Sequence, residues 1–219
     1  MKNRLNDSSI RWIEITTGIL NRYVEHYADY AALEGLPCAG KTTVINGLRS
    51  LSTHYIVDEL RLPPKEESCI SYLQQESSRT NNINNFKSMQ RSIIGDRCIV
   101  STLAHKATLL TFQEPTNYTM ELETLEHLSS NKQVILPARI ISLDISINTS
   151  RARQRFRDRD ILEGRLWYDP IFLSIIDEAT VQILNRLYGN RSKITHVNSE
   201  SNSEKITINQ IREILEGKK

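Results

Sequence analysis

Two glycines and a lysine–threonine pair have the spacing of a phosphate-binding loop. Gly35 is followed by four residues and then by Gly40, Lys41 and Thr42, within the stretch LEGLPCAGKTT. Glycines at these positions let the backbone turn tightly and approach a ligand, so that N–H groups and a helix N-terminus converge on phosphate oxygens. The lysine then bridges the β- and γ-phosphates, and the threonine hydroxyl binds Mg²⁺. The motif therefore predicts binding of a nucleoside triphosphate.

The residues around this motif predict the strand and the helix that such a loop requires. Ala31, Ala32 and Leu33 form a short apolar run, as a buried parallel strand would, and residues 42–48 suit a helix that begins at Lys41. The alternative is a glycine-bearing turn before an ordinary helix, which the spacing and the context disfavour. The nucleotide-binding residues predicted from the loop are Gly35, Leu36, Pro37, Cys38, Ala39, Gly40, Lys41, Thr42 and Thr43.

Two further predicted strands end in charged residues. The stretch HYIVDEL contains Asp58 and Glu59 near its end, and SIIGDRCIVS, from 92 to 101, contains Asp96 and Arg97. Ligands of open α/β sheets bind at the carboxyl ends of strands, so we expect these side chains beside the phosphate-binding loop. The carboxylates would act there as a base or as partners of Mg²⁺ and its waters, and the arginine as a bidentate phosphate ligand. For the first pair, a solvated acidic turn is the alternative.

The most basic stretch of the chain, RARQRFRDRD, runs from Arg151 to Asp160 and carries five arginines and two aspartates. On a helix, Arg151, Arg155 and Arg159 lie on one side, at positions i, i+4 and i+8. A solvated helix more often mixes lysine with glutamate, whereas arginine forks suit phosphoryl oxygens. We therefore predict that these arginines contact the phosphates of the nucleotide. Nucleic-acid binding is a minor alternative.

The composition of the whole chain sets wider limits. Its 219 residues suffice for one α/β domain with a substantial core and are slightly few for two. Charged residues make up 25% and the net charge is +2, which does not indicate a nucleic-acid or membrane surface. Cys38, Cys69 and Cys98 form no CxxC pair and there is no histidine cluster, so a zinc site is not expected. With no signal-peptide pattern at the start, we expect a cytoplasmic protein.

The remaining hydrophobic patterns predict the other elements. Residues 1–29 read as an added amphipathic helix that packs on the domain or forms a homodimer contact. His54 and His196 sit inside strand patterns, where core or strand-edge roles are more common than catalysis. Further elements are expected as helix and mobile loop over 65–91, helix over 103–131 with a break at Pro115, strand over 138–145, helix over 170–188, strand over 193–198 and helix over 203–215.

With these residues assembled, the chain resembles the thymidylate kinase and deoxynucleoside kinase branch of P-loop kinases. Four segments carry the resemblance: LEGLPCAGKTT at 33–43, VDEL at 57–60, DRCIVSTLAH at 96–105, and SLDIS with the arginine-rich segment at 142–160. The third is similar to the Asp-Arg-aromatic segment of thymidylate kinases. Two features differ from that family, since DELRLP replaces its Arg-Glu-Pro-Gly-Gly-Thr after the second strand and Cys98 replaces its aromatic residue.

The resemblance implies an α/β, three-layer P-loop kinase fold, in which a five-stranded parallel sheet is flanked by helices and a mobile lid covers ATP. The helical extension would be 1–29, the kinase domain 30–219 and the lid about 150–165. Mg²⁺ would be the cofactor and ATP the phosphoryl donor. The catalytic residues expected are Lys41, Glu59, Asp96, Arg97 and Arg155; the metal residues are Thr42, Glu59 and Asp96; and the lid adds Arg151, Arg155 and Arg159 to the nucleotide site.

The sequence thus predicts ATP-dependent phosphoryl transfer to a nucleotide or nucleoside, because every group that positions and neutralises a transferring phosphoryl has a candidate. A nucleoside monophosphate is slightly favoured by the Asp-Arg segment, with Arg97 at the acceptor end. A nucleoside or another small hydroxylated metabolite is the alternative, with Glu59 as base. A nucleotide-binding module without catalysis is a second alternative, which the joint presence of Lys41, Thr42, Asp96 and the lid arginines disfavours.

Overall fold

The computed structural model describes residues 4–49, 54–58, 68–86, 92–112, 117–157, 166–189 and 193–217. Its elements are α1 (Asp7–Tyr23), β1 (His26–Glu34), α2 (Lys41–Arg49), β2 (His54–Val57), α3 (Cys69–Phe86), β3 (Ser92–Asp96), α4 (Ile99–Phe112), α5 (Thr119–Ser130), β4 (Leu136–Asp144), α6 (Ile147–Arg157), the short 3₁₀ helix η2 (Leu166–Tyr168), α7 (Pro170–Tyr188), β5 (Ile194–Asn198) and α8 (Glu204–Leu215). Within these residues, five parallel strands form one sheet in the order β2-β3-β1-β4-β5. The strand before the glycine loop is therefore central.

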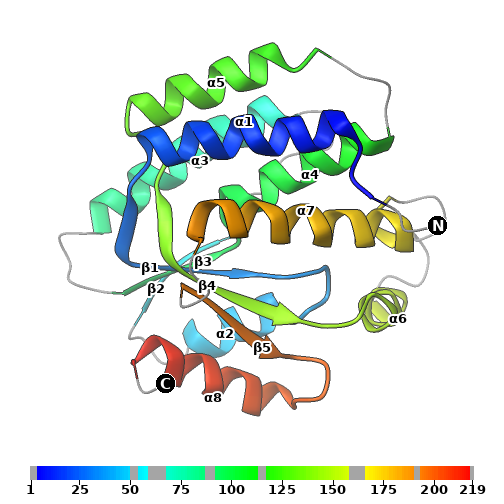
Figure 1. Cartoon of the computed structure of the whole chain (residues 1–219). Coiled ribbons are helices and arrows are strands. Elements are labelled where there is room, and N and C mark those ends of the chain that lie inside the picture. The colour runs from blue at the N-terminus through cyan, green and yellow to red at the C-terminus, as the bar shows by residue number, and fades with distance from the viewer. Residues whose placement is uncertain are drawn as a thin grey trace.

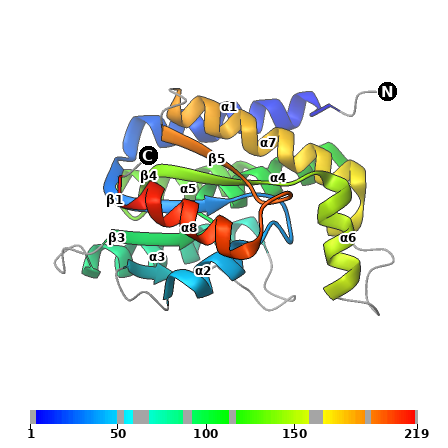
Figure 2. The ribbon, with the colours of Figure 1, turned by 90° about the horizontal axis from the view of Figure 1, so that it is seen from below.

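Helices cover both faces of this sheet. Figure 1 shows α1, α3, α4, α5 and α7 above the strands and α2 and α8 below them. Figure 2, seen from below, shows α6 apart from both layers, at the end toward which the strands run. The expected three-layer α/β arrangement is confirmed, and its carboxyl edge is the place where ligands of such sheets bind.

Neighbouring residues of each central strand face opposite layers. The first residue of each pair packs in the large core under the upper helices, and the second packs in the smaller core shared with α2 and α8. The pairs are Ala32 and Leu33 in β1, Ile93 and Ile94 in β3, and Ile140 and Ile141 in β4. Strands alternate in this way with a period of two. Because both faces are covered, successive residues in the middle of these strands are apolar, which explains why the sequence shows short continuous apolar runs there rather than alternation.

The N-terminal helix α1 belongs to the large core. The Asn6 side chain caps it by accepting a hydrogen bond from Ser9 N. Trp12 is fully buried, donates from Nε1 to the Leu103 carbonyl oxygen at 3.1 Å and meets the Tyr118 ring edge-on at 5.5 Å. These contacts show that α1 packs on the domain, which is the first of the two roles expected for residues 1–29.

Strand β1 begins before the expected boundary at residue 30. It starts at His26, and its first residues pair with Leu136 and Pro137 of β4. The start of the strand is partly exposed and polar, so it carries no apolar pattern. Pairing with β4, which lies far away in the sequence, extends β1 by the four residues before position 30. A local sequence pattern does not reveal such pairing.

The stretch 92–101 was expected to be one strand, and this expectation is wrong for its second half. β3 ends at Asp96, Arg97 adopts a φ of 68°, and α4 begins at Ile99. A short apolar run is compatible with a buried strand or a buried helix, and periodicity alone does not separate them. The turn at Arg97 separates two buried elements that look continuous in the sequence.

The later elements agree closely with expectation. Helix 170–188 is confirmed as α7, strand 193–198 as β5 from Ile194, and helix 203–215 as α8 with Ser203 as its cap. Within the stretch 65–91, where helix and mobile loop were expected, α3 supplies the helix and includes the asparagine-rich residues 81–85; residues 87–91 lie outside the described part, as does Pro115.

Candidate active site

The glycine loop connects β1 to α2 in the predicted order. Gly35 has a φ of 140°, and a Cβ there would meet the Leu143 carbonyl oxygen at 2.6 Å, so the chain requires glycine at this position. Ala39 N donates to the Leu36 carbonyl oxygen at 3.2 Å, which closes the loop before α2 begins at Lys41. The N-terminus of α2, with backbone N–H groups that have no helical acceptor, follows directly.

Lys41 folds back over this loop. It is 7% exposed, and Nζ donates to the carbonyl oxygens of Gly35 at 2.9 Å and Leu36 at 3.0 Å. Thr42 is exposed and Thr43 is half-buried at the same helix start. The ammonium and the threonine hydroxyl thus lie at a helix N-terminus, where phosphate oxygens are favoured.

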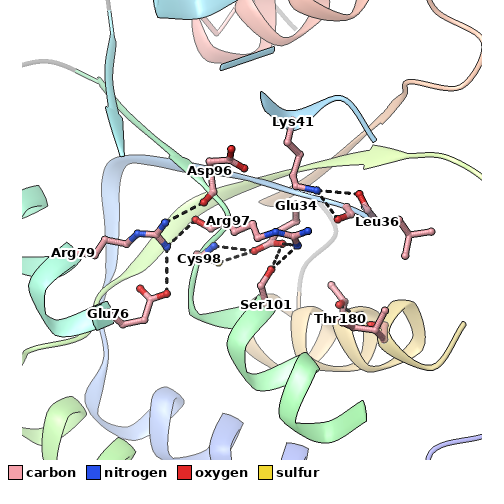
Figure 3. Close-up of polar contacts among 12 residues, drawn as sticks. Glu34, Leu36, Lys41, Glu76, Arg79, Asp96, Arg97, Cys98, Ser101 and Thr180 are labelled. Carbon is pink, nitrogen blue, oxygen red and sulfur yellow. Dashed lines mark hydrogen bonds and ion pairs between the residues drawn. The ribbon is translucent and has the colours of Figure 1, made fainter. Parts of the chain in front are cut away.

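Asp96 ends β3 beside the glycine loop. The register pairs it with Leu33, and the Leu33 carbonyl oxygen accepts from Arg97 N at 3.0 Å. Asp96 is 4% exposed, and Figure 3 shows it near Lys41 at the carboxyl edge of the sheet. The tertiary structure thus brings Lys41 to the same edge of the sheet as Asp96 and Arg97, which follow it in the sequence by 55 and 56 residues.

Glu34, the last residue of β1, is a site residue that the sequence analysis did not select. It is 1% exposed, and its carboxylate accepts from Cys98 N at 3.0 Å and from Ser101 Oγ at 2.6 Å. Arg97 Nη1 lies 3.7 Å from Glu34 Oε2 and donates to Ser101 Oγ at 3.0 Å. Glu34 stands next to Gly35 in the quoted motif, and this position beside the glycine loop was the one sequence feature that pointed to a role in the site.

Cys98 stands at the position of the aromatic residue in the Asp-Arg segment of the thymidylate kinases that the sequence resembles. It is 2% exposed, and its Sγ lies 3.4 Å from Glu34 Oε1. Burial, reinforced by the Glu34 carboxylate, raises the pKa of the Cys98 thiol well above its ordinary value. The thiol is therefore protonated and unreactive near neutral pH, and it serves as a buried donor to Glu34.

The arginine-rich helix α6 touches the glycine loop through a residue outside the predicted stripe. Arg153 donates to the carbonyl oxygens of Cys38, at 3.3 Å, and Ser199, at 2.9 Å. Ser150 Oγ, one turn earlier, donates to the Pro37 carbonyl oxygen at 2.7 Å. This face of α6 joins the glycine loop to the turn after β5.

The predicted stripe itself lies against η2. The guanidinium groups of Arg151 and Arg155 lie 4.8 Å and 5.2 Å from the centre of the Tyr168 ring. Arg151 Nε also donates to the Tyr168 carbonyl oxygen at 3.1 Å. Arg159 lies outside the described residues, and phosphate contact by this stripe stays a prediction.

An aromatic cluster extends from η2 to α4. The His105 and Trp167 rings are stacked with their centres 5.1 Å apart, and both meet the Phe172 ring edge-on. Burial, with a smaller effect of the Arg97 charge, lowers the pKa of His105 to about 4. His105 is thus a neutral ring that links the segment after α6 to the helix that follows Arg97.

The predicted base and part of the predicted lid fall outside the described residues, and the predicted Mg²⁺ site is described only in part. Glu59 lies outside the described residues, as do residues 158–165 of the expected lid. Among the described residues, no group of three histidine, cysteine, aspartate or glutamate side chains is arranged to hold a metal ion. The two oxygen ligands predicted for Mg²⁺ that are described, Thr42 and Asp96, fit a hard cation whose other positions are filled by phosphates and water.

Solved structures with the same fold include nucleoside and nucleotide kinases. Deoxyadenosine kinase from M. mycoides, solved with the products dCMP and a flexible dCDP, has a TM-score of 0.62 and 15% identity, covering 86% of this chain and 99% of that one. Thymidylate kinase from Candida albicans has a TM-score of 0.59 and 16% identity, covering 87% and 92%. The YorR protein of Bacillus subtilis, in complex with phosphorylated GDP, has a TM-score of 0.54 and 15% identity, covering 86% and 96%.

These likenesses confirm the expected fold, that of the thymidylate and deoxynucleoside kinases. No protein-family model and no curated protein matches the sequence. In the described part of the chain, every helix is too short or too polar to cross a lipid bilayer.

Proposed function

We propose that this protein is an ATP-dependent kinase that transfers the γ-phosphoryl group to a nucleotide or nucleoside. The observation that carries the proposal is the convergence of Lys41, Asp96 and Arg97 at the carboxyl edge of the sheet, beside a glycine loop that leads into a helix. Phosphoryl transfer needs positioning and charge stabilisation more than covalent chemistry from the protein. This set of groups supplies both.

Each residue has a role that follows from its position. Backbone N–H groups at the start of α2 bind the phosphates, and Lys41 turns from the loop carbonyls to the β- and γ-phosphates. Thr42 and Asp96 would hold Mg²⁺, which supplies charge neutralisation for the transferring phosphoryl group when bound. Arg97 lies on the acceptor side of Asp96 and stabilises the negative charge of the transferred group.

Helix α6 contributes to the nucleotide side of the site. Arg153 connects the glycine loop to the turn after β5 through the Cys38 and Ser199 carbonyl oxygens. The nucleotide would enter between these two segments, with Arg153 forming one wall. Arg151, Arg155 and Arg159 are proposed to reach the phosphates when residues 150–165 close over ATP, which would exclude water as a competing acceptor.

A nucleoside monophosphate is the acceptor that the Asp-Arg segment favours, with Arg97 at its phosphate. One observation favours the alternative, a nucleoside hydroxyl. Arg97 lies 3.7 Å from Glu34 and Arg79 is hydrogen-bonded to Glu76, so both arginine charges beside the acceptor are already balanced by carboxylates. In that case Glu59 would act as the base on the hydroxyl.

Phosphorus NMR of the purified protein with Mg-ATP tests the proposal. Parallel samples would contain thymidine monophosphate, thymidine, and mixed nucleosides and nucleotides. A diphosphate product supports the monophosphate acceptor, and a monophosphate product supports the nucleoside acceptor. ADP without a phosphorylated partner would point to another metabolite, while no reaction with any acceptor would contradict the kinase proposal and favour a non-catalytic binding module.

A further inference from the structure

A buried arginine on α3 reaches the ends of two strands beside the proposed site. Arg79 is 4% exposed, and Glu76, one turn earlier, is 5% exposed. Figure 3 shows both side chains extending from α3 toward the turn that carries Asp96 and Arg97. Neither residue belongs to the sequence motifs that point to nucleotide binding.

The guanidinium of Arg79 binds three backbone carbonyl groups. Nη2 donates to the carbonyl oxygens of Asp58, at 2.7 Å, and Asp96, at 3.0 Å. Nη1 donates to the carbonyl oxygen of Arg97 at 3.1 Å and to Glu76 Oε1 at 3.2 Å. One side chain therefore connects the end of β2 to the end of β3.

These carbonyl groups lie just beyond the last backbone pair of the two strands. The register of β2 with β3 ends with Val57 opposite Gly95, and Asp58 and Asp96 come next. A buried carbonyl without a donor is unfavourable, and the planar fork of a guanidinium serves two acceptors side by side. Arg79 thus continues the connection between the strands one step past the sheet.

Glu76 makes this arrangement stable. A buried guanidinium is unfavourable without an opposite charge, and the Glu76 carboxylate is its ion-pair partner at 3.2 Å. A lysine at position 79 would keep the charge, but its one nitrogen carries three N–H donors, too few for the four acceptors that Arg79 binds with two nitrogens: the Asp58, Asp96 and Arg97 carbonyl oxygens and Glu76. The contacts therefore require arginine in particular.

We propose that Arg79 is a positioning residue of the acceptor side of the site. It fixes the backbone of Asp58, at the end of β2, relative to the Asp96–Arg97 turn, and Asp58 precedes the predicted base Glu59 in the sequence. Among the described residues, its hydrogen bonds go to these strand ends and to Glu76, and none goes to the glycine loop. Losing Arg79 should therefore lower the catalytic efficiency with the acceptor and leave ATP binding nearly unchanged. The inference rests on the proposed function.

Steady-state kinetics of Arg79→Lys and Arg79→Ala test this role. With the acceptor identified by phosphorus NMR, we expect kcat/KM for the acceptor to fall by about tenfold to a hundredfold, because a small misplacement of reacting groups has an effect of this size. The KM for ATP should stay within about twofold, because no uniform binding of ATP is removed. Guanidinium ion, added below the concentration that unfolds the protein, should restore part of the activity of Arg79→Ala. Arg186→Ala is the matched control, since Arg186 forms an exposed ion pair with Glu14.

Several outcomes would overturn the inference. Equal losses for ATP and acceptor would show a general structural role, and unchanged kinetics would show no role at all. If Arg79→Ala does not fold, Arg79→Lys, which retains the charge beside Glu76, carries the test.

Hydrogen exchange separates failure of this inference from failure of the proposed function. We expect faster exchange in Arg79→Lys for peptides that cover 54–58 and 92–98, with the remaining peptides unchanged. If the wild-type protein transfers no phosphoryl group, the proposed function is wrong, and the exchange result alone decides whether Arg79 ties the strand ends together. Unchanged or uniformly faster exchange would contradict that connection.

Discussion

The carboxylate of Glu34 lies 3.7 Å from the guanidinium of Arg97 and accepts hydrogen bonds from Cys98 N, just before α4, and from Ser101 Oγ within it. Glu34 ends the strand before the glycine loop, whereas Arg97 follows the neighbouring strand. The pair therefore ties the nucleotide-binding loop to the acceptor side of the site. It also fixes Arg97 in its positive-φ turn, which non-glycine residues adopt only with support from their surroundings.

Glu34→Gln should lower both stability and turnover. The amide keeps the size of the side chain and one acceptor oxygen, but it cannot accept from both Cys98 N and Ser101 Oγ as the carboxylate does, and the charge facing Arg97 is lost. We expect a loss of about 1–3 kcal/mol in the free energy of unfolding, the usual effect of leaving a buried polar group unsatisfied. Urea denaturation measures this value. Stability equal to that of the wild type would show that the network does not depend on the carboxylate.

Lys41→Ala should strongly reduce turnover while the protein stays folded. The lysine contributes charge that acts mainly on the transferring phosphate, and removing one such group typically lowers kcat by about 10²–10³-fold. ADP release with the acceptor present, together with circular dichroism, checks both statements. Lys205→Ala, which removes an exposed lysine on α8, is the control and should behave as the wild type. Full turnover in Lys41→Ala would exclude the proposed role of the loop.

Gly35→Ala should prevent nucleotide binding, whereas Gly18→Ala should stabilise the protein. A Cβ at position 35 would meet the Leu143 carbonyl oxygen at 2.6 Å in a backbone conformation that alanine disfavours, so the loop must move. Gly18 lies within α1 with open space around its Cα, where alanine is favoured by about 0.5–1 kcal/mol. Thermal denaturation with and without Mg-ATP measures both effects. A normal ATP-dependent shift in Gly35→Ala would contradict the loop geometry.

Arg153→Ala should weaken ATP binding more than Arg155→Ala. Arg153 contacts the glycine loop and the turn after β5, whereas Arg155 lies over the Tyr168 ring. Loss of two hydrogen bonds of about 0.5–1.5 kcal/mol each corresponds to a rise in the KM for ATP of about fivefold or more. If Arg155→Ala instead lowers kcat more strongly, the stripe predicted from the sequence acts in the closed lid. If both variants have the same kcat and KM as the wild type, α6 does not contribute to the site.

His105 should make the protein less stable in mild acid. Its pKa is about 4 in the folded state and 6.5 as the ordinary value, so between these values the unfolded chain binds more protons. Stability therefore falls as the pH decreases from about 6.5 to 4. Above pH 6.5 the ring is neutral in both the folded and the unfolded state, so His105 causes no further change of stability with pH. The melting temperature across this range measures the effect. His105→Phe should flatten the profile, whereas His127→Gln, at an exposed position, should leave it unchanged.

Much of the nucleotide side could be predicted from the sequence, because it depends on contiguous residues. The spacing of Gly35, Gly40 and Lys41 prescribes a local backbone path between a strand and a helix, and the structure has that path. The strand-end positions of Asp96 and Arg97 also followed, since carboxyl ends of parallel strands meet at one edge. Local patterns were sufficient wherever chemistry and conformation depend on neighbours in the chain.

The acceptor side could not be derived in the same way. Glu76 and Arg79 belong to no motif, and Glu34, although it stands beside Gly35, is not one of the residues that define the loop; all three acquire roles because α3 and α4 pack over the ends of β1, β2 and β3. The arginine patch was visible in the sequence, but helical periodicity did not reveal that Arg153, rather than Arg151 and Arg155, faces the glycine loop.

The sequence by itself determined the chemistry that the chain carries: a loop for phosphates, a lysine and threonine at its end, and charged residues after apolar strands. The tertiary structure decided which buried charges are paired and which carbonyl groups each arginine binds. The physical reason is that a local motif uses backbone conformation set within a few residues, whereas a buried ion pair requires two distant elements to exclude water together.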